Sequence, residues 1–212
     1  IDKDDPVVSN IDFVSSNKIN HLAKEGETIT LSFTIDEALL AATPPDITFD
    51  ISNTSVHPSR ITINNTNNNW EATFSTSSND PDGLISYKIQ NYKDLAGNTG
   101  ILVEGSGVTV DLTNPTIVGD ISFVSTNDNY NTLAKSEDTI RLSFATSETI
   151  DLPTITFDIS GTPVLNPIIH ISNTSENNWE ASFDVSSALH SDGMISYNVD
   201  FNDLAGNTNN SS

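Results

Sequence analysis

The residues of this chain that could do chemistry are nearly all oxygen donors. It contains 29 Asp and Glu residues against 8 Lys and Arg, four histidines and no cysteine. Carboxylate and amide oxygens are the ligands that calcium prefers, whereas transition metals favour nitrogen and sulfur. If a metal binds, these residue types therefore predict calcium. No spaced acidic loop of the EF-hand type is present in the sequence.

No catalytic set emerges from the same residues. The histidines are scattered, no two stand at metal-binding spacing, and no serine lies in a glycine-flanked nucleophile motif; they are His21, His57, His170 and His190. Acidic pairs are frequent, so counting alone does not exclude a two-carboxylate hydrolase. Such a pair needs a cleft, however, which small repeated modules rarely offer. The sequence predicts a protein that is not an enzyme.

The elements that position these residues occur twice. NWEATFSTSSNDPDGLISYKIQNYKDLAGNT (69–99) returns as NWEASFDVSSALHSDGMISYNVDFNDLAGNT (178–208), and ITFDIS (47–52) returns as ITFDIS (155–160). Self-similarity at a fixed period is typical of repeated modules. We therefore predict two domains, residues 1–110 and 111–212. The first residues, Ile1 to Pro6, match Val110 to Pro115, which leads us to expect that the chain is a fragment of a longer array.

Every apolar run alternates with a period of two, which is typical of strands with one buried face. The first module has seven such runs, near 11–14 and at 28–33, 47–51, 61–63, 70–74, 85–89 and 108–110. Trp70 and Trp179 each lie in such a stripe and are predicted to fill the core. The segment 36–42 is expected to be a variable loop. Nothing after Asn207 matches 101–110, so the second module is predicted to lack its seventh strand.

Seven short strands in about 105 residues, separated by turns rich in Asn, Ser, Asp, Gly and Pro, are typical of an immunoglobulin-like sandwich. We predict an all-β chain of two tandem immunoglobulin-like β-sandwich domains. The repeated motif Asp-Leu-Ala-Gly-Asn, at 94–98 and 203–207, suits a turn. Its Asp can close an Asx-turn, its Gly and Asn supply positive-φ positions, and its Leu is expected to cover the sandwich end. A metal role for the Asp is an additional hypothesis.

The formal charge of −21 narrows the classes of partner. With the division at Asp111, the first copy carries 15 acidic and 6 basic residues and the second 14 and 2. Such a field repels nucleic-acid phosphates and attracts cations, which excludes nucleic-acid binding. One interpretation of the negative charge is that it keeps the protein soluble, and the other is that it binds divalent cations. No stretch approaches the roughly 18 apolar residues of a membrane span.

The order of several motifs resembles the bacterial immunoglobulin-like repeats of large adhesins and other surface proteins. The motifs are LAKxx(E/D)TIxLSF, NWEA, DGxISY and DLAGNT, and 107–115 is similar to the last strand and linker between such repeats. The resemblance covers nearly the whole chain. It implies an extracellular or cell-surface location and a role as spacer or binding module. It also implies calcium at some joints between repeats.

In such a sandwich, loops at the end of the first module face loops at the start of the second. The loop with Asp80 and Asp82 is then expected to face Glu148, Asp151 and Asp203, with the linker between them. Converging carboxylates repel one another unless a cation bridges them. The predicted interdomain calcium ligands are Asp82, Asp111, Asn114 and Asp203. The alternative is a solvated acidic joint.

The predicted function is that of non-enzymatic spacer modules in a long cell-surface protein of the adhesin-stalk type, with neighbouring repeats of the same chain as partners. The alternative is an adhesive module that binds a cell-surface glycan or protein, or a segment of a surface-layer protein. A binder would expose aromatic side chains in variable loops. The sequence offers three candidates for that role, Tyr92, Tyr130 and Phe201.

Overall fold

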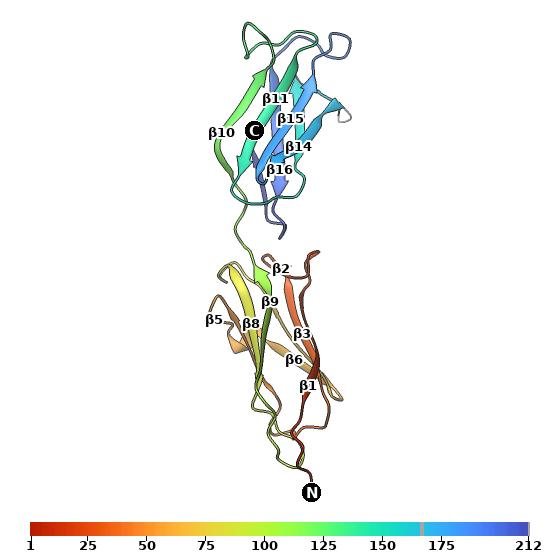
Figure 1. Cartoon of the computed structure of the whole chain (residues 1–212), viewed down its shortest axis with the longest axis vertical. Helices are drawn as coiled ribbons and strands as arrows, with labels where there is room; N and C mark the ends of the chain where they lie inside the picture. The colour runs from red at the N-terminus through yellow and green to blue at the C-terminus, as the bar shows by residue number, and fades with distance from the viewer. Residues whose placement is uncertain (166–167, 212) are drawn as a thin grey trace. The chain divides into compact units, whose positions relative to one another are not determined.

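The computed structural model describes residues 1–165 and 168–211, which divide into two compact units, Ile1–Thr113 and Asn114–Ser212. The boundary lies three residues after the one expected from the repeat. Both units consist of strands packed in two layers (Figure 1). Among the described residues no helix is long and apolar enough to cross a membrane.

Unit 1 contains two facing sheets. The first has the order β1-β3-β7-β6 and the second the order β2-β9-β8-β4-β5. The bounds of the first sheet are β1 Val8–Ser15, β3 Thr28–Ile35, β7 Asn69–Ser75 and β6 Thr62–Thr66. Those of the second are β2 Leu22–Ala23, β9 Val103–Val110, β8 Gly83–Gln90, β4 Asp46–Ile51 and β5 Thr54–Ser55. A 3₁₀ turn, η1, covers Pro58–Arg60.

The core of unit 1 comes from the predicted alternation. Along β3 every second residue is buried, and β4 and β8 follow the same period. Aromatic side chains of the two sheets meet in the middle, where the ring centroids of Phe49 in β4 and Phe74 in β7 are 5.0 Å apart. Burial of one face is what a two-layer sandwich requires of each strand. Trp70 stacks on Phe33 at the rim of this core and is only half-buried.

Two details of unit 1 differ from the sequence prediction. Ile63 was expected to face inward, but its side chain is 42% exposed, because β6 is an edge strand with no buried residue. Tyr92 was a candidate solvent-facing aromatic, but it is 1% exposed. The positive φ of Asn91 (59°) interrupts the alternation after β8, so that Tyr92 turns inward. The segment 36–42 is a loop, as predicted, in which Leu39 forms a bridge with Asp94.

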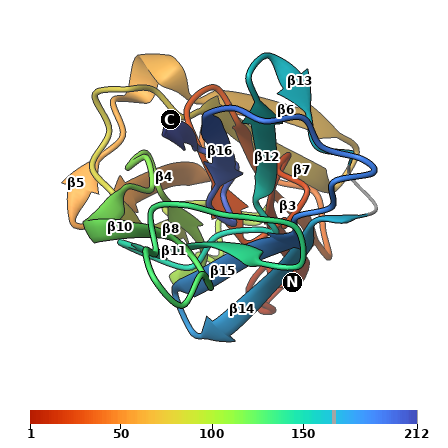
Figure 2. The same cartoon turned by 90° about the horizontal axis from the view of Figure 1, so that it is seen from above.

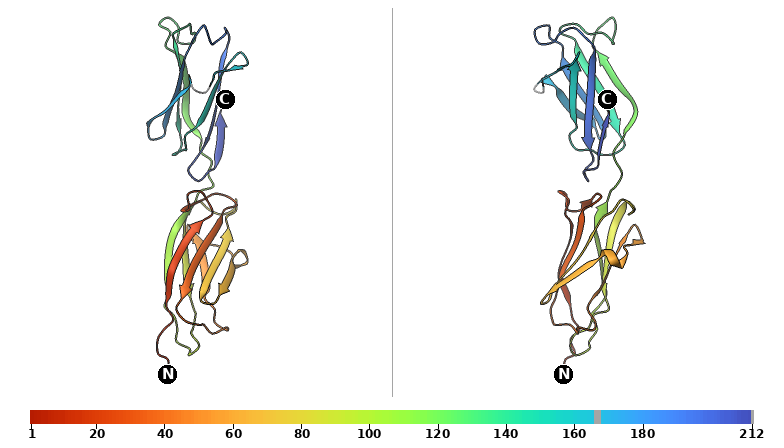
Figure 3. Two further views of the ribbon diagram at one scale, coloured as in Figure 1. Left: turned by 90° about the vertical axis from the view of Figure 1, so that its right-hand side faces the viewer. Right: turned by 180° about the vertical axis from the view of Figure 1, so that it is seen from behind.

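Unit 2 repeats this architecture, and its two layers face each other in side view (Figure 3). The orders are β10-β11-β15-β14 and β13-β12-β16-β17. The bounds are β10 Ile117–Ser125, β11 Thr139–Thr146, β15 Asn178–Asp184 and β14 His170–Ser175. The second sheet consists of β13 Thr162–Pro163, β12 Thr154–Ile159, β16 Ile195–Asn202 and β17 Thr208–Ser211. In the end-on view β12 and β16 lie side by side (Figure 2), paired from Thr154↔Asp200 to Ile159↔Ile195.

The buried residues of unit 2 include Trp179, which is 7% exposed and fills the core as predicted. Phe201, a second candidate solvent-facing aromatic, is 3% exposed because it continues the inward stripe of β16. The sequence predicted that unit 2 lacks its seventh strand, and this prediction is wrong, because a four-residue strand, β17, stands there. Thr208–Ser211 pair with the last part of β16, because backbone hydrogen bonds need no apolar side chain.

Candidate metal centre

The repeated Asp-Leu-Ala-Gly-Asn motif folds as a turn in which the Asp carboxylate binds the backbone ahead of it. In unit 1, Asp94 Oδ1 accepts hydrogen bonds from the N–H groups of Gly97 (2.6 Å) and Asn98 (2.8 Å). Its Oδ2 accepts one from Asn98 Nδ2 at 2.6 Å. Gly97 has φ +96°, a conformation that favours glycine. The Asp closes a turn as predicted, but its hydrogen bonds reach three and four residues ahead, whereas an Asx-turn reaches two. Gly97 has the predicted positive φ, and Asn98 does not.

The same turn recurs in unit 2. Asp203 Oδ1 accepts hydrogen bonds from the N–H groups of Gly206 (2.6 Å) and Asn207 (2.9 Å), and its Oδ2 accepts one from Asn207 Nδ2 at 2.8 Å. Both carboxylates are buried, with Asp94 0% and Asp203 1% exposed. The leucine of the motif does not cover the sandwich end as expected, since Leu95 is 67% exposed and Leu204 is 40% exposed.

These hydrogen bonds determine how Asp94 ionises. Burial raises the pKa of the Asp94 carboxyl, but the hydrogen bonds from Asn98 and Gly97 stabilise the carboxylate and hold the pKa below its ordinary value. Asp94 is thus an anion at neutral pH. An ionised carboxylate offers about four lone-pair directions, and the turn directs the donors of Gly97 and Asn98, together with the backbone N–H of Ala96, at this carboxylate.

Two further acids stand beside Asp94 in unit 1. Asp2, Glu37 and Asp94 each offer a carboxylate oxygen, and these oxygens all lie within 4.8 Å of one another. Burial, followed by the charges of Asp94 and Asp2, raises the pKa of Glu37. Like charges held this close disfavour ionisation of one member. The donor set consists of hard oxygen ligands only, which fits calcium and does not fit a thiophilic metal.

Part of this arrangement recurs in unit 2. Glu148 and Asp203 there offer carboxylate oxygens within the same 4.8 Å. Glu37 and Glu148 follow Phe33 and Phe144 by four residues each, so a full alignment of the two repeats would have paired them. Glu148 was among the acidic residues expected at the joint, and its counterpart Glu37 was not. The Asp2–Glu37–Asp94 cluster was therefore missed, although the repeat carried the signal.

Three of the four predicted calcium ligands accept hydrogen bonds within their own units. Asp82 Oδ1 accepts a hydrogen bond from the N–H of Leu112 at 2.7 Å, and its Oδ2 accepts one from the Thr113 hydroxyl. Asp111 Oδ1 accepts a hydrogen bond from the N–H of Thr113 at 3.2 Å. Asp82 and Asp111 thus both bind the segment Leu112–Thr113 at the end of unit 1. Asn114 is an exposed residue at the start of unit 2, and Asp203 holds the turn described above.

The described contacts of the histidines do not join them into an acid–base set. His57 Nδ1 caps η1 through the N–H of Ser59, and His190 Nδ1 accepts a hydrogen bond from the N–H of Ser186 at 3.1 Å. Both are local turn contacts. Among the described salt bridges, none involves a histidine. The side chains therefore give no support to catalysis by a histidine.

Solved structures with the same architecture include fragments of titin. The I-band fragment I67-I69 from titin matches with a TM-score of 0.56 at 14% sequence identity, over 99% of this chain and 64% of that one. An E-to-A variant of the same three-domain titin fragment gives 0.53 at 13%, with the same coverage. Both units have an immunoglobulin-like fold. The chain spans about 64% of those titin fragments, and at these identities the likeness establishes the fold alone.

No protein-family model matches the chain, and no curated protein sequence matches it. What is established is a nearly all-β chain of two tandem immunoglobulin-like sandwiches.

Proposed function

We propose that the chain is a non-enzymatic spacer segment of a long cell-surface protein, of the adhesin-stalk type. A spacer must resist force applied between its two ends. The observation that carries this proposal is the parallel pairing of β2, which follows the first strand β1, with β9, the last strand of unit 1. The chain enters that unit at one end and leaves it at the opposite end (Figure 1).

Near the exit, β2 and β9 run parallel, with Leu22 opposite Thr109 and Ala23 opposite Val110. The N–H of Thr109 donates to the carbonyl of His21, and the N–H of Asp111 donates to the carbonyl of Ala23, both at 2.9 Å. Because the two strands are parallel, pulling β2 and β9 toward opposite ends of the unit loads these bonds together in shear. Opening them one at a time would need less force.

The side chains also favour a spacer over an adhesive module. A binder of glycans or proteins was expected to expose Tyr92, Tyr130 and Phe201, but Tyr92 and Phe201 belong to the cores. Of the described aromatic residues only Tyr130, at 67%, is among the exposed large hydrophobic side chains. A single exposed ring is a small platform for a ligand.

Forced unfolding of the chain, tethered at its two ends, tests the proposal. A spacer is expected to give two separate events, each releasing about 30 nm of chain for roughly 100 residues. The two forces should differ, because the described part of unit 2 has no counterpart of the β2–β9 pair. Extension without resolved events would contradict a spacer. Saturable binding of a glycan at Tyr130 would favour the adhesive module instead.

Calcium binding is the second part of the proposal. Its support is the oxygen-only set of Asp2, Glu37 and Asp94, in which ionisation of Glu37 is opposed by its neighbours. A divalent cation would neutralise this repulsion and stabilise unit 1 by mass action. The interdomain set of Asp82, Asp111, Asn114 and Asp203 stays a prediction from the sequence. Calorimetric titration of the chain with calcium tests whether the cluster binds the ion. A melting temperature that is the same with calcium and with chelator would contradict calcium binding.

A further inference from the structure

Strand β6 forms an outer edge of unit 1, and all of its side chains are exposed. It is the last strand of the sheet β1-β3-β7-β6, and no described strand pairs with its outer side. Its pairing with β7 runs from Thr62↔Thr73 to Thr66↔Asn69 without a register shift. On the side away from β7, alternate N–H and C=O groups of such a strand point outward and can pair with a further strand. β6 is therefore a regular, open edge.

From β1 to β14, the other edge strands that the structure describes carry features that oppose pairing with another chain. The strands β1, β10 and β14 each contain a register shift in their pairing. The strands β2, β5 and β13 are only two residues long. Bulges and very short strands are means by which natural sheets protect their edges. β6 has neither of these features.

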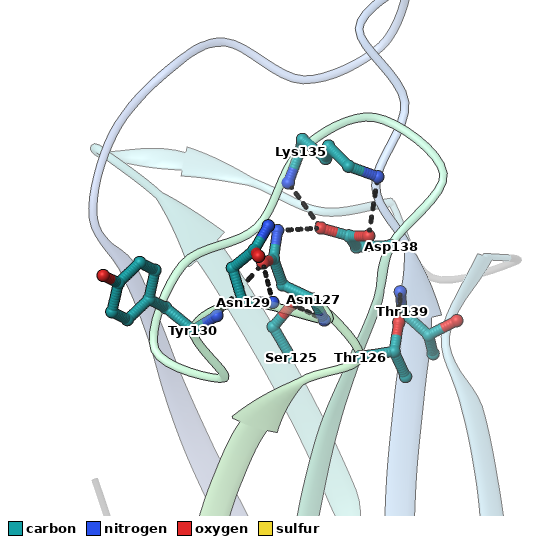
Figure 4. A network of polar contacts seen from close by, with 8 residues as sticks. All are labelled: Ser125, Thr126, Asn127, Asn129, Tyr130, Lys135, Asp138 and Thr139. Atoms are coloured by element: carbon teal, nitrogen blue, oxygen red, sulfur yellow. Dashed lines mark hydrogen bonds and ion pairs between the residues drawn. The ribbon is translucent and has the colours of Figure 1, made fainter.

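A loop also covers part of the β10 edge. The N–H of Ser125, at the end of β10, donates to the carbonyl of Asn131 at 2.7 Å. Asp138 holds this loop in place, because its Oδ2 accepts hydrogen bonds from Asn127 Nδ2 (2.9 Å) and from the N–H of Lys135 (2.8 Å) (Figure 4). This donor of the β10 edge is thus used within unit 2.

The lack of charge on β6 stands out in a chain with a formal charge of −21. Residues 61–70, ITINNTNNNW, contain no charged side chain. Charged side chains on an edge strand repel a second strand. Two copies of an acidic chain also repel each other as they approach. An uncharged edge is where a second copy meets the least of this repulsion.

Ile63 gives the β6 edge an apolar contact surface. Its side chain is 42% exposed, and it is not among the residues packed against the core of unit 1. Its partner on β7 is Ala72, which is fully buried. A strand paired with the outer side of β6 would cover part of the Ile63 side chain and remove apolar surface from water.

We propose that β6 pairs with β6 of a second copy of this chain, antiparallel and about a two-fold axis. The segment Thr-Ile-Asn-Asn-Thr suits such pairing. With the axis at Asn64, the opposed residues of the two copies are Thr62 and Thr66, Ile63 and Asn65, and Asn64 and Asn64. Threonine pairs stabilise antiparallel strands, and no like charges face each other. A two-fold interface requires this self-complementarity.

Sedimentation equilibrium of the whole chain over a series of concentrations tests the proposal. Five residue pairs make a small interface, so a weak dimer is expected, with a dissociation constant below about 1 mM. Ile63→Lys removes the apolar contact and adds a charge to the edge, and it should weaken dimerisation at least about tenfold. Ile11→Lys is the matched control and should leave dimerisation unchanged. Ile11 is 39% exposed and belongs to β1, the bulged edge of the same sheet. Circular dichroism checks that both variants are folded.

A single introduced cysteine tests the register, because the chain has no cysteine of its own. Directly opposed residues of antiparallel strands have Cα atoms about 4.5–5.5 Å apart, which a disulfide can span. Under mild oxidation, Asn64→Cys should form a linked dimer at least about tenfold faster than Asn173→Cys, since only Asn64 lies on the proposed axis. Asn173 is an exposed residue of the bulged edge strand β14.

A chain that stays monomeric up to about 1 mM would overturn the proposal. An Ile63→Lys chain that dimerises as tightly as the unchanged chain would do the same. Dimerisation that Ile11→Lys also removes would assign the contact to another surface and contradict pairing through β6. Equal rates of disulfide formation by the two cysteine variants would contradict the two-fold register at Asn64. None of these outcomes bears on the pairing of β2 with β9, so this proposal and the spacer function can fail separately.

Discussion

Asp94 and Asn98 close the end of unit 1 with two contacts, one from the Asn98 N–H to Oδ1 at 2.8 Å and one from Asn98 Nδ2 to Oδ2 at 2.6 Å. Asp203 and Asn207 do the same in unit 2. In unit 1 the turn thereby keeps the ionised carboxylate of Asp94 inside a loop. In unit 1 this carboxylate also has Asp2 and Glu37 beside it, so one residue serves both the turn and the candidate metal centre.

Asn98→Ala should lower the free energy of unfolding of unit 1 by about 1–2 kcal/mol, because it removes one hydrogen bond to a buried charge. Asn207→Ala should have the same effect on unit 2. Urea denaturation measures both. Two variants that each cost less than a few tenths of a kcal/mol would show that the turn does not depend on this side chain.

Gly97→Ala should destabilise unit 1 by about 1–2 kcal/mol, since the residue has φ +96°. Gly107→Ala is the matched control in the same unit. A Cβ there meets only Phe13 at an ordinary 3.8 Å, and the φ is not positive. Thermal melting of both variants should give a lower melting temperature for Gly97→Ala alone; equal shifts would contradict the conformational argument.

The stability of unit 1 should fall as the pH drops below about 4, the ordinary pKa of Asp. Hydrogen bonds hold the pKa of Asp94 below its unfolded value, despite burial, and those from Arg60 do the same for Asp80. A carboxyl with a depressed folded pKa contributes stability above its unfolded pKa and loses it as the pH falls through the folded one. Urea denaturation from pH 6 to about pH 2.5 should be less pH-dependent for Asp94→Asn than for the unchanged chain. Identical pH profiles would refute the assignment.

Calcium affinity should weaken as the pH falls through the raised pKa of Glu37, because protons and the metal compete for the same carboxylate. Glu37→Gln should weaken binding at neutral pH, whereas Glu25→Gln, an exposed acid of the same unit outside the cluster, should not. Isothermal titration of the three chains provides the comparison. Equal affinities for all three would show that calcium, if bound, is held elsewhere.

Asp80→Asn should destabilise unit 1 by about 2 kcal/mol, because Arg60 donates two hydrogen bonds of 2.6 Å to this carboxylate. The Asp80 side chain is 8% exposed. The control is Glu104→Gln, which breaks an exposed pair with Lys88 and should cost at most about 0.5 kcal/mol. Urea denaturation separates the two; a negligible cost for Asp80→Asn would contradict the role given to this ion pair.

Much of the fold could be predicted from local pattern. The alternation of apolar residues gave the buried faces of the long strands, and the repeat indicated two modules. The failures have physical causes that pattern does not reveal. Ile63 fits the alternating pattern, but no residue of its edge strand β6 is buried. The left-handed conformation of Asn91 changes the side of the sheet that Tyr92 faces.

The candidate metal centre was only partly predictable. The turn of Asp94 follows from its residue types, whereas its meeting with Asp2 and Glu37 depends on tertiary structure across loops far apart in sequence. The sequence predicted Asp82 in a loop at the end of the first module and Asp111 on the linker. The structure shows that their carboxylates hold the backbone of Leu112 and Thr113.

The central claim is that unit 1 resists force through the parallel pair of β2 and its last strand, β9. The most direct test compares the forces that unfold the Thr109→Pro and the His21→Ala chains. Proline removes the N–H that donates to the carbonyl of His21, while His21→Ala keeps that carbonyl. Forced unfolding is governed by the unfolding rate, so loss of one sheared bond should lower the unfolding force directly. The account predicts that Thr109→Pro lowers the larger of the two forces and that His21→Ala changes neither. An unchanged larger force in a folded Thr109→Pro chain would contradict it.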